Sequence, residues 1–240
     1  MDAANAHNGE LDKIPAEDDS LEMGETAAST EDGEDRRIPK AVIKRLSLYS
    51  RVLQHLERDK VEKVSSTELG RQLGLNSAQV RKDLAYFGQF GVPGFGYPVR
   101  ELRQNIKRIL GTDKEIRVAL VGVGNLGTAL LSYPGFRRQG FRLMCAFDIQ
   151  PKWETYGVDK TPIYRISELE ARIRQYKVDF AILAVPADAA QGVVDRLGEA
   201  GISGILNFVP CRIEVPEQIQ VHYIDLALEM ESLSYFIKLR

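Results

Sequence analysis

The sequence contains three glycines at the spacing Gly-x-Gly-x-x-Gly: Gly122, Gly124 and Gly127. Such a turn between a strand and a helix lets backbone N–H groups approach a dinucleotide pyrophosphate at the helix N-terminus. Asp148 ends the next apolar run, where a carboxylate accepts hydrogen bonds from ribose hydroxyls and repels a 2′-phosphate. The glycine pattern alone is a weak signal, but this context favours an NAD(H) site over a turn that serves only packing.

The predicted nucleotide contacts are Asp148 and the whole turn: Gly122, Val123, Gly124, Asn125, Leu126 and Gly127. A hydride-transfer enzyme would also need a proton donor beside its nicotinamide. Of the three histidines, His7 and His55 lie outside the segment that carries the turn. His222 lies in a strand-like run, where a histidine is more often structural than catalytic. The sequence therefore favours binding without turnover and predicts no catalytic residue and no metal ligand.

A second group of residues suggests DNA recognition. Val80, Leu84 and Phe87 form the apolar face of a predicted helix that is capped by Ser77 and runs to about Phe87. Gln79, Arg81 and Lys82 lie off that face near the start of the helix. In a helix that enters the major groove, Arg and Lys at such positions suit guanine and Gln suits adenine. The alternative is a solvated helix face whose charges are incidental.

Other side chains near this helix suit the phosphate backbone, where contacts set the register without specifying sequence. We expect phosphate contacts from Arg45, Arg51, Ser65 and Ser66. Tyr97, in the glycine-rich hairpin that follows, completes the predicted DNA-contacting set.

The net charge of −2 conceals a strong asymmetry along the chain. Residues 1–35 carry twelve acids and one base, residues 36–110 carry sixteen bases and six acids, and residues 111–240 carry fifteen bases and sixteen acids. The middle segment is therefore strongly basic, as expected of a domain that binds nucleic acid. The first segment is predicted to be a disordered acidic tail, either inert or competing with DNA for the basic surface.

The predicted elements form two domains. In residues 36–110, an amphipathic helix from about Pro39 precedes a capping box at 65–68, a turn at Gly74, a helix capped by Ser77 and a hairpin at 90–99. This is the order of a winged helix, and a connecting helix at about 99–110 follows. Residues 111–225 alternate strands and helices, which predicts a Rossmann-like parallel sheet in an α/β protein. The expected strands are 116–121, 141–148, 178–185, 204–208 and 221–225, and the expected helices are 125–133, 167–176 and 188–200. A last helix is expected within residues 226–240.

The cysteines and the hydropathy pattern suggest an intracellular protein. Cys145 and Cys211 lie in apolar contexts that favour two buried, reduced thiols. The N-terminus has no apolar signal-peptide core, and no run reaches membrane-spanning length. We therefore expect a cytoplasmic protein without a membrane partner.

Eight ordered segments make the sequence similar to the redox-sensing transcriptional repressors called Rex. The resemblance covers about 39–238 and includes motifs in both domains. The segments are Arg45-Leu46 with Tyr49 and Arg51, Gln79–Leu84, Tyr86–Gly88, Gly94–Tyr97, Gly122–Gly127, Tyr133–Phe136, Phe147-Asp148 and Gly204–Phe208.

The resemblance implies a homodimer whose winged helices bind an inverted-repeat operator and whose Rossmann-like domains bind NAD(H). It also implies that the helix in 226–240 swaps into the partner subunit, and that NADH releases the operator. Tyr133 and Asp225 match positions near the nicotinamide. Asn125 stands where some members have an arginine that pairs with the acid at Asp225. Pro93 stands where some members have a basic wing residue that enters the minor groove.

Two alternatives remain open. One is an NAD-dependent oxidoreductase with an appended regulatory winged helix. The other is a ligand-responsive repressor whose pocket takes another adenine nucleotide or coenzyme A. Turnover assays would detect the first, and competition among nucleotides would detect the second.

Overall fold

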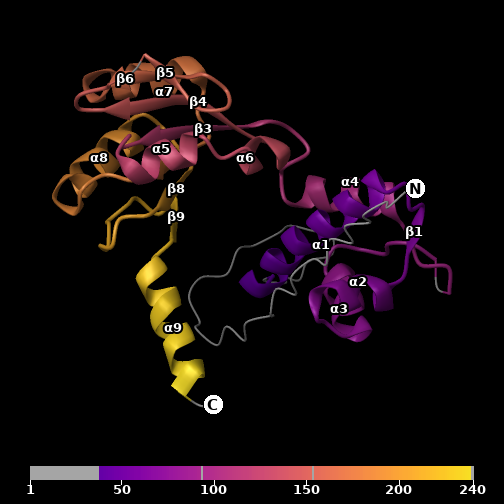
Figure 1. Ribbon diagram of the computed structural model, residues 1–240. Helices are drawn as coiled ribbons and strands as arrows, with labels where there is room; N and C mark the ends of the chain where they lie inside the picture. The colour runs from indigo at the N-terminus through magenta and orange to yellow at the C-terminus, as the bar shows by residue number, and fades with distance from the viewer. Residues whose placement is uncertain (1–37, 93, 153, 239–240) are drawn as a thin grey trace, which may run out of the picture. The chain divides into compact units, whose positions relative to one another are not determined.

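The computed structural model describes residues 38–92, 94–152 and 154–238. The chain divides into two compact units between Asp113 and Lys114, each of which has its own hydrophobic core (Figure 1). No helix in these described ranges is long and apolar enough to cross a membrane.

The first unit is a winged helix. Four helices surround a core that includes Leu46, Tyr49 and Val80, and a two-stranded antiparallel sheet flanks them. The elements are α1 (Lys40–Arg58), β1 (Lys63–Val64), α2 (Ser66–Leu73), α3 (Ser77–Ala85), β2 (Tyr97–Pro98) and α4 (Val99–Ile109).

Local side chains determine where α2 and α3 begin. The Ser65 Oγ accepts a hydrogen bond from the Glu68 backbone N–H at 3.0 Å, which confirms the predicted N-cap. The Glu68 carboxylate pairs with Arg71 at 2.9 Å. The predicted cap of α3 is wrong by one residue, because the Asn76 side chain accepts from the Gln79 N–H at 2.8 Å and Ser77 is the first helical residue.

The second unit contains a seven-stranded sheet in the order β5-β6-β4-β3-β7-β8-β9, parallel in every pair except β5 with β6. The bounds of β3 and β4 agree with the prediction, whereas β5 and β6 were not predicted. The strands are β3 (Ile116–Val121), β4 (Phe141–Asp148), β5 (Thr155–Tyr156), β6 (Thr161–Arg165), β7 (Phe180–Leu183), β8 (Gly204–Asn207) and β9 (Gln220–Tyr223).

Helices cover both faces of this Rossmann-like sheet. Successive side chains of β3 point to opposite faces of the sheet. Ala119 and Val121 belong to one buried cluster, and Val118 and Leu120 belong to another. Both faces are therefore apolar, as in parallel sheets generally. The covering helices are α5 (Asn125–Leu131), α6 (Gly135–Arg138), α7 (Leu169–Tyr176) and α8 (Ala187–Glu199), with a 3₁₀ turn at Ile166–Glu168. A further helix, α9 (Leu226–Lys238), follows the last strand.

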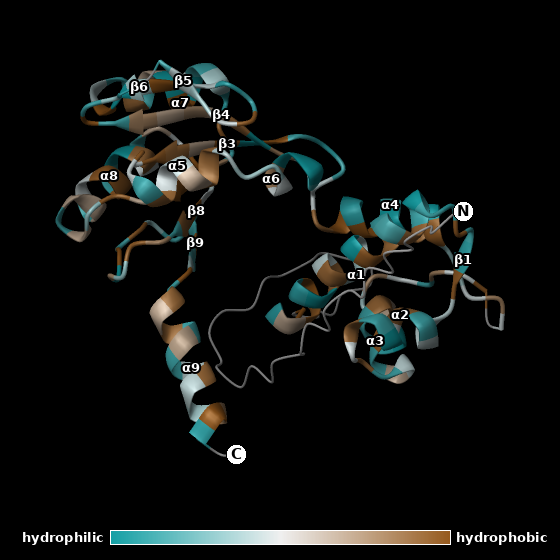
Figure 2. Ribbon diagram, viewed as in Figure 1, coloured by the Kyte–Doolittle hydropathy of each residue, from teal (hydrophilic) through white to brown (hydrophobic). Residues whose placement is uncertain are grey.

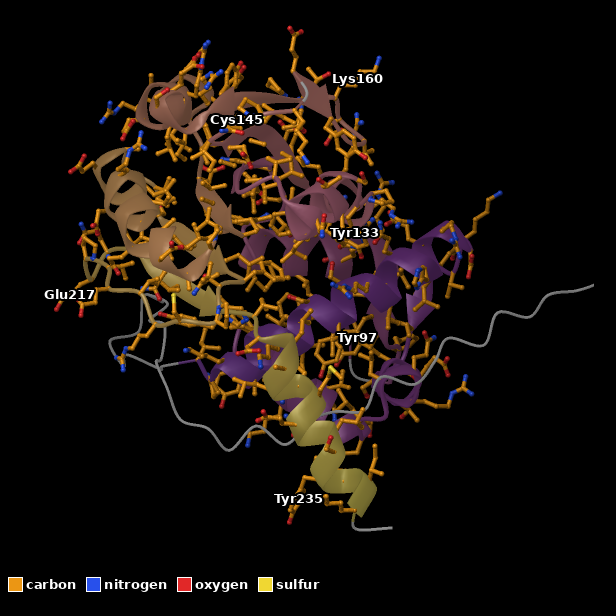
Figure 3. All side chains as sticks on the ribbon, turned by 60° about the vertical axis from the view of Figure 1, so that its left-hand side comes forward. Tyr97, Tyr133, Cys145, Lys160, Glu217 and Tyr235 are labelled. Carbon is orange, nitrogen blue, oxygen red and sulfur yellow. The ribbon has the colours of Figure 1, made fainter. Side chains whose placement is uncertain are left out.

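The final helix, α9, is exposed along its whole length. Figure 2 shows hydrophobic residues along it, and Tyr235 stands out from the helix into the surroundings (Figure 3). Seven large apolar side chains of α9 are each at least 60% exposed: Leu226, Leu228, Met230, Leu233, Tyr235, Phe236 and Ile237.

Both cysteines are free thiols. Cys145 is buried in the sheet, and burial raises the pKa of its thiol to about 12, so it stays protonated. Cys211 is only half-buried, contrary to the prediction of two buried thiols.

Candidate functional site

The glycine turn follows β3, and each of its three glycines has a different surrounding. A Cβ on Gly122 would lie 2.2 Å from the Ala184 carbonyl oxygen, directly after β7. A Cβ on Gly127 would lie 2.0 Å from the Gly122 carbonyl oxygen, so this glycine lets α5 pack onto the turn. Gly124 is exposed, and a Cβ there would meet nothing within 4 Å. These are the three roles of a dinucleotide-binding turn: a tight bend, open space for the pyrophosphate and close helix packing.

Asp148 lies at the carboxyl end of β4 and is joined to the glycine turn. Its Oδ2 accepts a hydrogen bond from the Val123 N–H at 2.9 Å, and its Oδ1 accepts from the Gln150 N–H at 2.9 Å. An ionised carboxylate has about four lone-pair positions, so each oxygen keeps acceptor capacity for a ribose hydroxyl. The predicted ribose-binding residue therefore also fixes the turn, a role that the sequence did not indicate.

Tyr133 (Figure 3) follows α5 and is 55% exposed. Its ring meets the Phe136 ring edge-on, with the ring centroids 5.1 Å apart. The position of the ring depends on Gly135, because a Cβ there would lie 2.2 Å from the tyrosine ring. Gly135 therefore leaves the space in which the Tyr133 ring lies.

Asp225 is the N-terminal cap of α9. Its Oδ1 accepts hydrogen bonds from the Ala227 N–H at 2.9 Å and the Leu228 N–H at 3.4 Å. Within the described residues, no side-chain hydrogen bond joins Asp225 or Tyr133 to the glycine turn. Asp148 is thus hydrogen-bonded to the glycine turn, whereas Tyr133 and Asp225, the two residues predicted near the nicotinamide, form no side-chain hydrogen bond with it among the described residues.

Asn207 is a site residue that the sequence analysis did not select. It ends β8 at the same edge of the sheet as Asp148, and it is fully buried. Its Nδ2 donates to the carbonyls of Val209 and Cys211, both at 3.2 Å, and its Oδ1 accepts from the Val209 N–H at 2.8 Å. Asn207 therefore shapes the loop beyond β8, and an asparagine within an apolar strand was the available signal.

In the first unit, Arg81 and Lys82 lie exposed on α3. The Arg81 Nη1 donates to the Ser66 Oγ at 3.0 Å, which joins α3 to the start of α2. Arg81, Ser65, Ser66 and Tyr97 line a hollow of about 510 Å³ between these helices and the hairpin. Arg51 is exposed on α1. Most of the predicted DNA contacts thus lie around one hollow or on exposed helix faces.

Arg45 and Gln79 differ from the expectation of free DNA-contacting side chains, because both bind Asp83. Arg45 forms two hydrogen bonds to the Asp83 carboxylate, at 2.6 and 2.9 Å, and the Gln79 Nε2 donates to it at 2.7 Å. The buried Tyr49 hydroxyl donates to it at 2.6 Å. Asp83 was not predicted from the sequence, although an acid beside Lys82 in a basic helix was the signal.

The Asp83 carboxylate is fully buried and stays ionised. Burial raises the pKa of the carboxyl, but the hydrogen bonds from Arg45, Tyr49 and Gln79 outweigh it and leave the pKa below its ordinary value. Burial and the Asp83 hydrogen bond both raise the pKa of Tyr49, which therefore remains a donor. This group, the Asp83 cluster, ties α3 to α1 beneath the exposed face of α3.

Comparisons with known proteins agree with this architecture. The family model described as "Putative DNA-binding protein N-terminus" matches residues 37–85, and the one described as "CoA binding domain" matches residues 113–211. The fold and its two sites thus define a DNA-binding protein with an attached nucleotide-binding domain.

One curated relative, a redox-sensing transcriptional repressor Rex from Listeria welshimeri, is 44% identical over 205 residues, which are 85% of this chain and 95% of the relative. The crystal structure of RSP in complex with β-NAD⁺ and operator DNA matches with a TM-score of 0.77 and 38% identity, over 83% of this chain and 92% of that one. RSP in complex with β-NADH matches with a TM-score of 0.73 and 36% identity, over 85% and 99%. The chain belongs to the Rex family of redox-sensing transcriptional repressors.

Proposed function

We propose that this protein represses transcription by binding an inverted-repeat operator as a homodimer, and that NADH releases it from the DNA. The observation that carries the nucleotide half of this proposal is the open space at Gly124, between two glycines that are packed against backbone. The relative RSP has been crystallised with β-NADH, and with β-NAD⁺ together with operator DNA. The DNA partner implies a cytoplasmic protein.

For the nucleotide, we assign the pyrophosphate to the turn from Gly122 to Gly127 and the ribose to Asp148. The lone-pair capacity of Asp148 and the absence of a Cβ at Gly124 support this assignment. Tyr133 and Asp225 are assigned to the nicotinamide side. For DNA, Arg81 and Lys82 face the bases, while Arg51, Ser65, Ser66 and Tyr97 contact the backbone. Gln79, predicted to face the bases, instead binds Asp83. Arg45 acts through Asp83, by holding α3 in place.

The exposed helix α9 supports the dimer. An amphipathic helix with seven large apolar side chains at least 60% exposed needs a covering surface, because contiguous exposed apolar area marks interaction sites. We assign that surface to the partner subunit, with the helix of each subunit exchanged. This exchange places each nucleotide-binding domain in the dimer interface. The interface in turn determines the distance between the two DNA-binding units, which must match the two halves of the operator.

Release of DNA requires that NADH bind the non-operator form of the dimer more tightly than the operator-bound form. A nearly complete shift in occupancy needs a difference of about 5 kcal/mol between the two forms. Asn125, exposed at the start of α5, carries no charge to pair with Asp225, so the coupling in this chain uses hydrogen bonds or a different partner. The function is binding without turnover, because a relative 44% identical to this chain is a transcriptional repressor. A strand histidine such as His222, on β9, is more often structural than catalytic.

The test compares two glycines that both face open space. Gly124→Val fills the proposed pyrophosphate position, and Gly192→Val, in α8, is the matched control. We expect Gly124→Val to bind the operator normally but to stay bound when NADH is added, while Gly192→Val is released like the unmodified protein. Asp148→Ala should also lose release. Normal release of both Gly124→Val and Asp148→Ala would refute the site.

Two further measurements separate the alternatives. Competition of NADH with NAD⁺, NADPH and acyl-coenzyme A should rank NADH first, whereas preference for acyl-coenzyme A would favour the other type of repressor. Absorbance at the nicotinamide band, followed with hydroxy acids and amino acids as substrates, should show no turnover. Sustained oxidation or reduction would favour the oxidoreductase.

A further inference from the structure

The hairpin between α3 and α4 carries no charge, although it belongs to the most basic part of the chain. Residues 88–98 contain no Asp, Glu, Lys or Arg, whereas residues 36–110 as a whole carry sixteen bases and six acids. A hairpin of this kind cannot contact DNA through its own charged side chains. Any contribution that it makes to binding must come from its backbone, its apolar side chains or its uncharged polar side chains.

Close backbone contacts give the tip of this hairpin a narrow shape. Gly91, Gly94 and Gly96 all have positive φ, at 75°, 82° and 77°. A Cβ on Gly91 would lie 2.4 Å from the Gly96 carbonyl oxygen, and a Cβ on Gly96 would lie 2.7 Å from that of Val64. Side chains are therefore excluded from these two positions, and the two arms of the tip lie backbone against backbone.

Two large apolar side chains project from this narrow tip. Phe95 is 71% exposed and Val92 is 62% exposed. A turn holds them, because the Phe95 N–H donates to the Val92 carbonyl at 3.0 Å and Val92 forms an antiparallel bridge with Gly96. The Lys63 Nζ, on β1, lies over the Phe95 ring at 5.8 Å from its centroid. Phe95 thus presents an exposed aromatic ring with a cation beside it.

The tip continues the surface that carries the proposed DNA contacts. Val92, Gly94 and Gly96 line the same hollow as Arg81 of α3 and Ser66 of α2. A double helix whose major groove holds α3 therefore brings a neighbouring groove or strand to the hairpin. The minor groove is about 6 Å wide, which a tip flanked by glycines can enter and a tip with branched side chains on both arms cannot.

We propose that Phe95 is an apolar wedge for the minor groove of the operator, and that Lys63 binds a phosphate at the rim of that groove. This inference rests on the proposed operator binding and adds a residue that determines its strength and position. Phenylalanine is among the side chains that insert at base steps in the minor groove and bend the duplex. A charged hairpin would contribute through its own electrostatic contacts with DNA. Here the hairpin contributes through burial of the apolar Phe95 side chain, and Lys63 on β1 supplies the cation.

The two contributions differ in their dependence on salt. The logarithm of the DNA-binding constant falls linearly with the logarithm of the salt concentration. Loss of one phosphate contact makes this line less steep by about 0.9, whereas loss of an apolar contact leaves its steepness unchanged. Burial of a phenylalanine side chain corresponds to a change in affinity of about tenfold to a hundredfold. The salt series therefore separates the role of Phe95 from that of Lys63.

The experiment uses the full-length protein and a duplex selected by that protein from a random library. Fluorescence anisotropy at several salt concentrations compares Phe95→Ala, Phe95→Leu and Lys63→Gln, with Val158→Ala as an exposed apolar control in the other unit. We expect Phe95→Ala to bind at least about tenfold more weakly with an unchanged slope. Phe95→Leu should keep most of the affinity, Lys63→Gln should lower the slope, and Val158→Ala should have no effect.

Hydroxyl-radical footprinting, which reports access to the minor groove, locates the contact. We expect Phe95→Ala to lose protection at the positions reached by the hairpin and to keep the protection given by α3. Equal affinity of Phe95→Ala and the unmodified protein would overturn the proposal, as would a reduced salt slope for Phe95→Ala. A change in oligomeric state without DNA would also overturn it, because a second copy of the chain would then cover the tip. If the unmodified protein selects no duplex, the proposed operator binding fails as well.

Discussion

Replacement of Asp83 by alanine is expected to destabilise the DNA-binding unit alone. The Asp83 carboxylate accepts hydrogen bonds from Arg45, Tyr49 and Gln79, and the Asp83 side chain has no exposed surface. Asp83→Ala therefore leaves a guanidinium and a buried hydroxyl without their acceptor. The effect should remain within residues 38–113, since all four side chains belong to that unit.

The magnitude follows from the burial of each group. Breaking a buried ion pair by removal of one partner costs about 3–5 kcal/mol. The Arg45 side chain is 22% exposed, so water replaces part of what it loses, whereas the fully buried Tyr49 hydroxyl adds a desolvation cost of about 1–3 kcal/mol. With both contributions near the low end of their ranges, we expect a total of about 4–5 kcal/mol for Asp83→Ala, and roughly half of that for Asp83→Asn, which keeps one acceptor oxygen.

Hydrogen exchange followed by mass spectrometry measures this loss separately in each unit. Protection of amides in α1 and α3 should fall at least about a hundredfold in Asp83→Ala, because every 1.4 kcal/mol corresponds to about a factor of ten. Protection in β3 and β4 should not change. Glu68→Gln is the control, since Glu68 and its partner Arg71 are 38% and 75% exposed and such a pair contributes less than about 1 kcal/mol. Equal effects of the two substitutions would refute the reasoning.

The pH dependence gives a second check on the same cluster. The pKa of Asp83 in the folded protein lies below its ordinary value of 3.8, so the stabilisation is fully present above that value and is lost as the pH falls below it. The difference in the free energy of unfolding between the unmodified protein and Asp83→Ala should therefore be constant from pH 7 to about 4. It should become smaller only at lower pH. Narrowing between pH 7 and 5 would mean that burial, not hydrogen bonding, controls this pKa.

Three other predictions concern separate parts of the protein. The hydrogen bond from Arg196 lowers the pKa of Glu170 from 4.5 to about 2. Glu170→Gln should therefore lower the free energy of unfolding by less than about 1 kcal/mol above pH 4.5, and acid-unfolding curves should show this loss disappear toward pH 2. Lys82→Ala should lower operator affinity by about 1–3 kcal/mol and reduce the preference over random duplex, measured by anisotropy; equal losses on both duplexes would limit Lys82 to backbone contact. Phe236→Asp places a charge in the proposed dimer contact and should give monomers in sedimentation analysis, whereas an unchanged dimer would contradict the exchange of α9.

Much of the fold could be predicted because it depends on local signals. Ser65 caps α2 as its spacing from Glu68 indicates, and the bounds of β3 and β4 follow from continuous apolar runs that are typical of a buried parallel sheet. The glycine turn was identifiable because its spacing and flanking elements occur together. Strand β6 escaped prediction because it has proline at its second position, which weakens any strand pattern.

The partners of individual side chains could not be predicted, because they depend on tertiary contacts. Asp83 meets Arg45 and Tyr49 across 38 and 34 residues of sequence, and no local pattern specifies that meeting. The same limit applies to Gly135, whose importance depends on where the Tyr133 ring lies. In the sequence, Arg45 suggests a phosphate contact because it lies in a basic segment. Only the structure, in which Arg45 binds the buried Asp83 carboxylate, shows that it holds α3 in place.

The central claim is that one nucleotide, NADH, lowers the affinity of this protein for its operator. The most direct test is anisotropy of the selected duplex with the unmodified protein, titrated with NADH and, separately, with NAD⁺ at equal total nucleotide. We expect NADH to raise the Kd for the operator by at least about a hundredfold while NAD⁺ leaves it low, a ratio that corresponds to roughly 3 kcal/mol of coupling. Equal operator affinity with NADH and NAD⁺ would contradict the account.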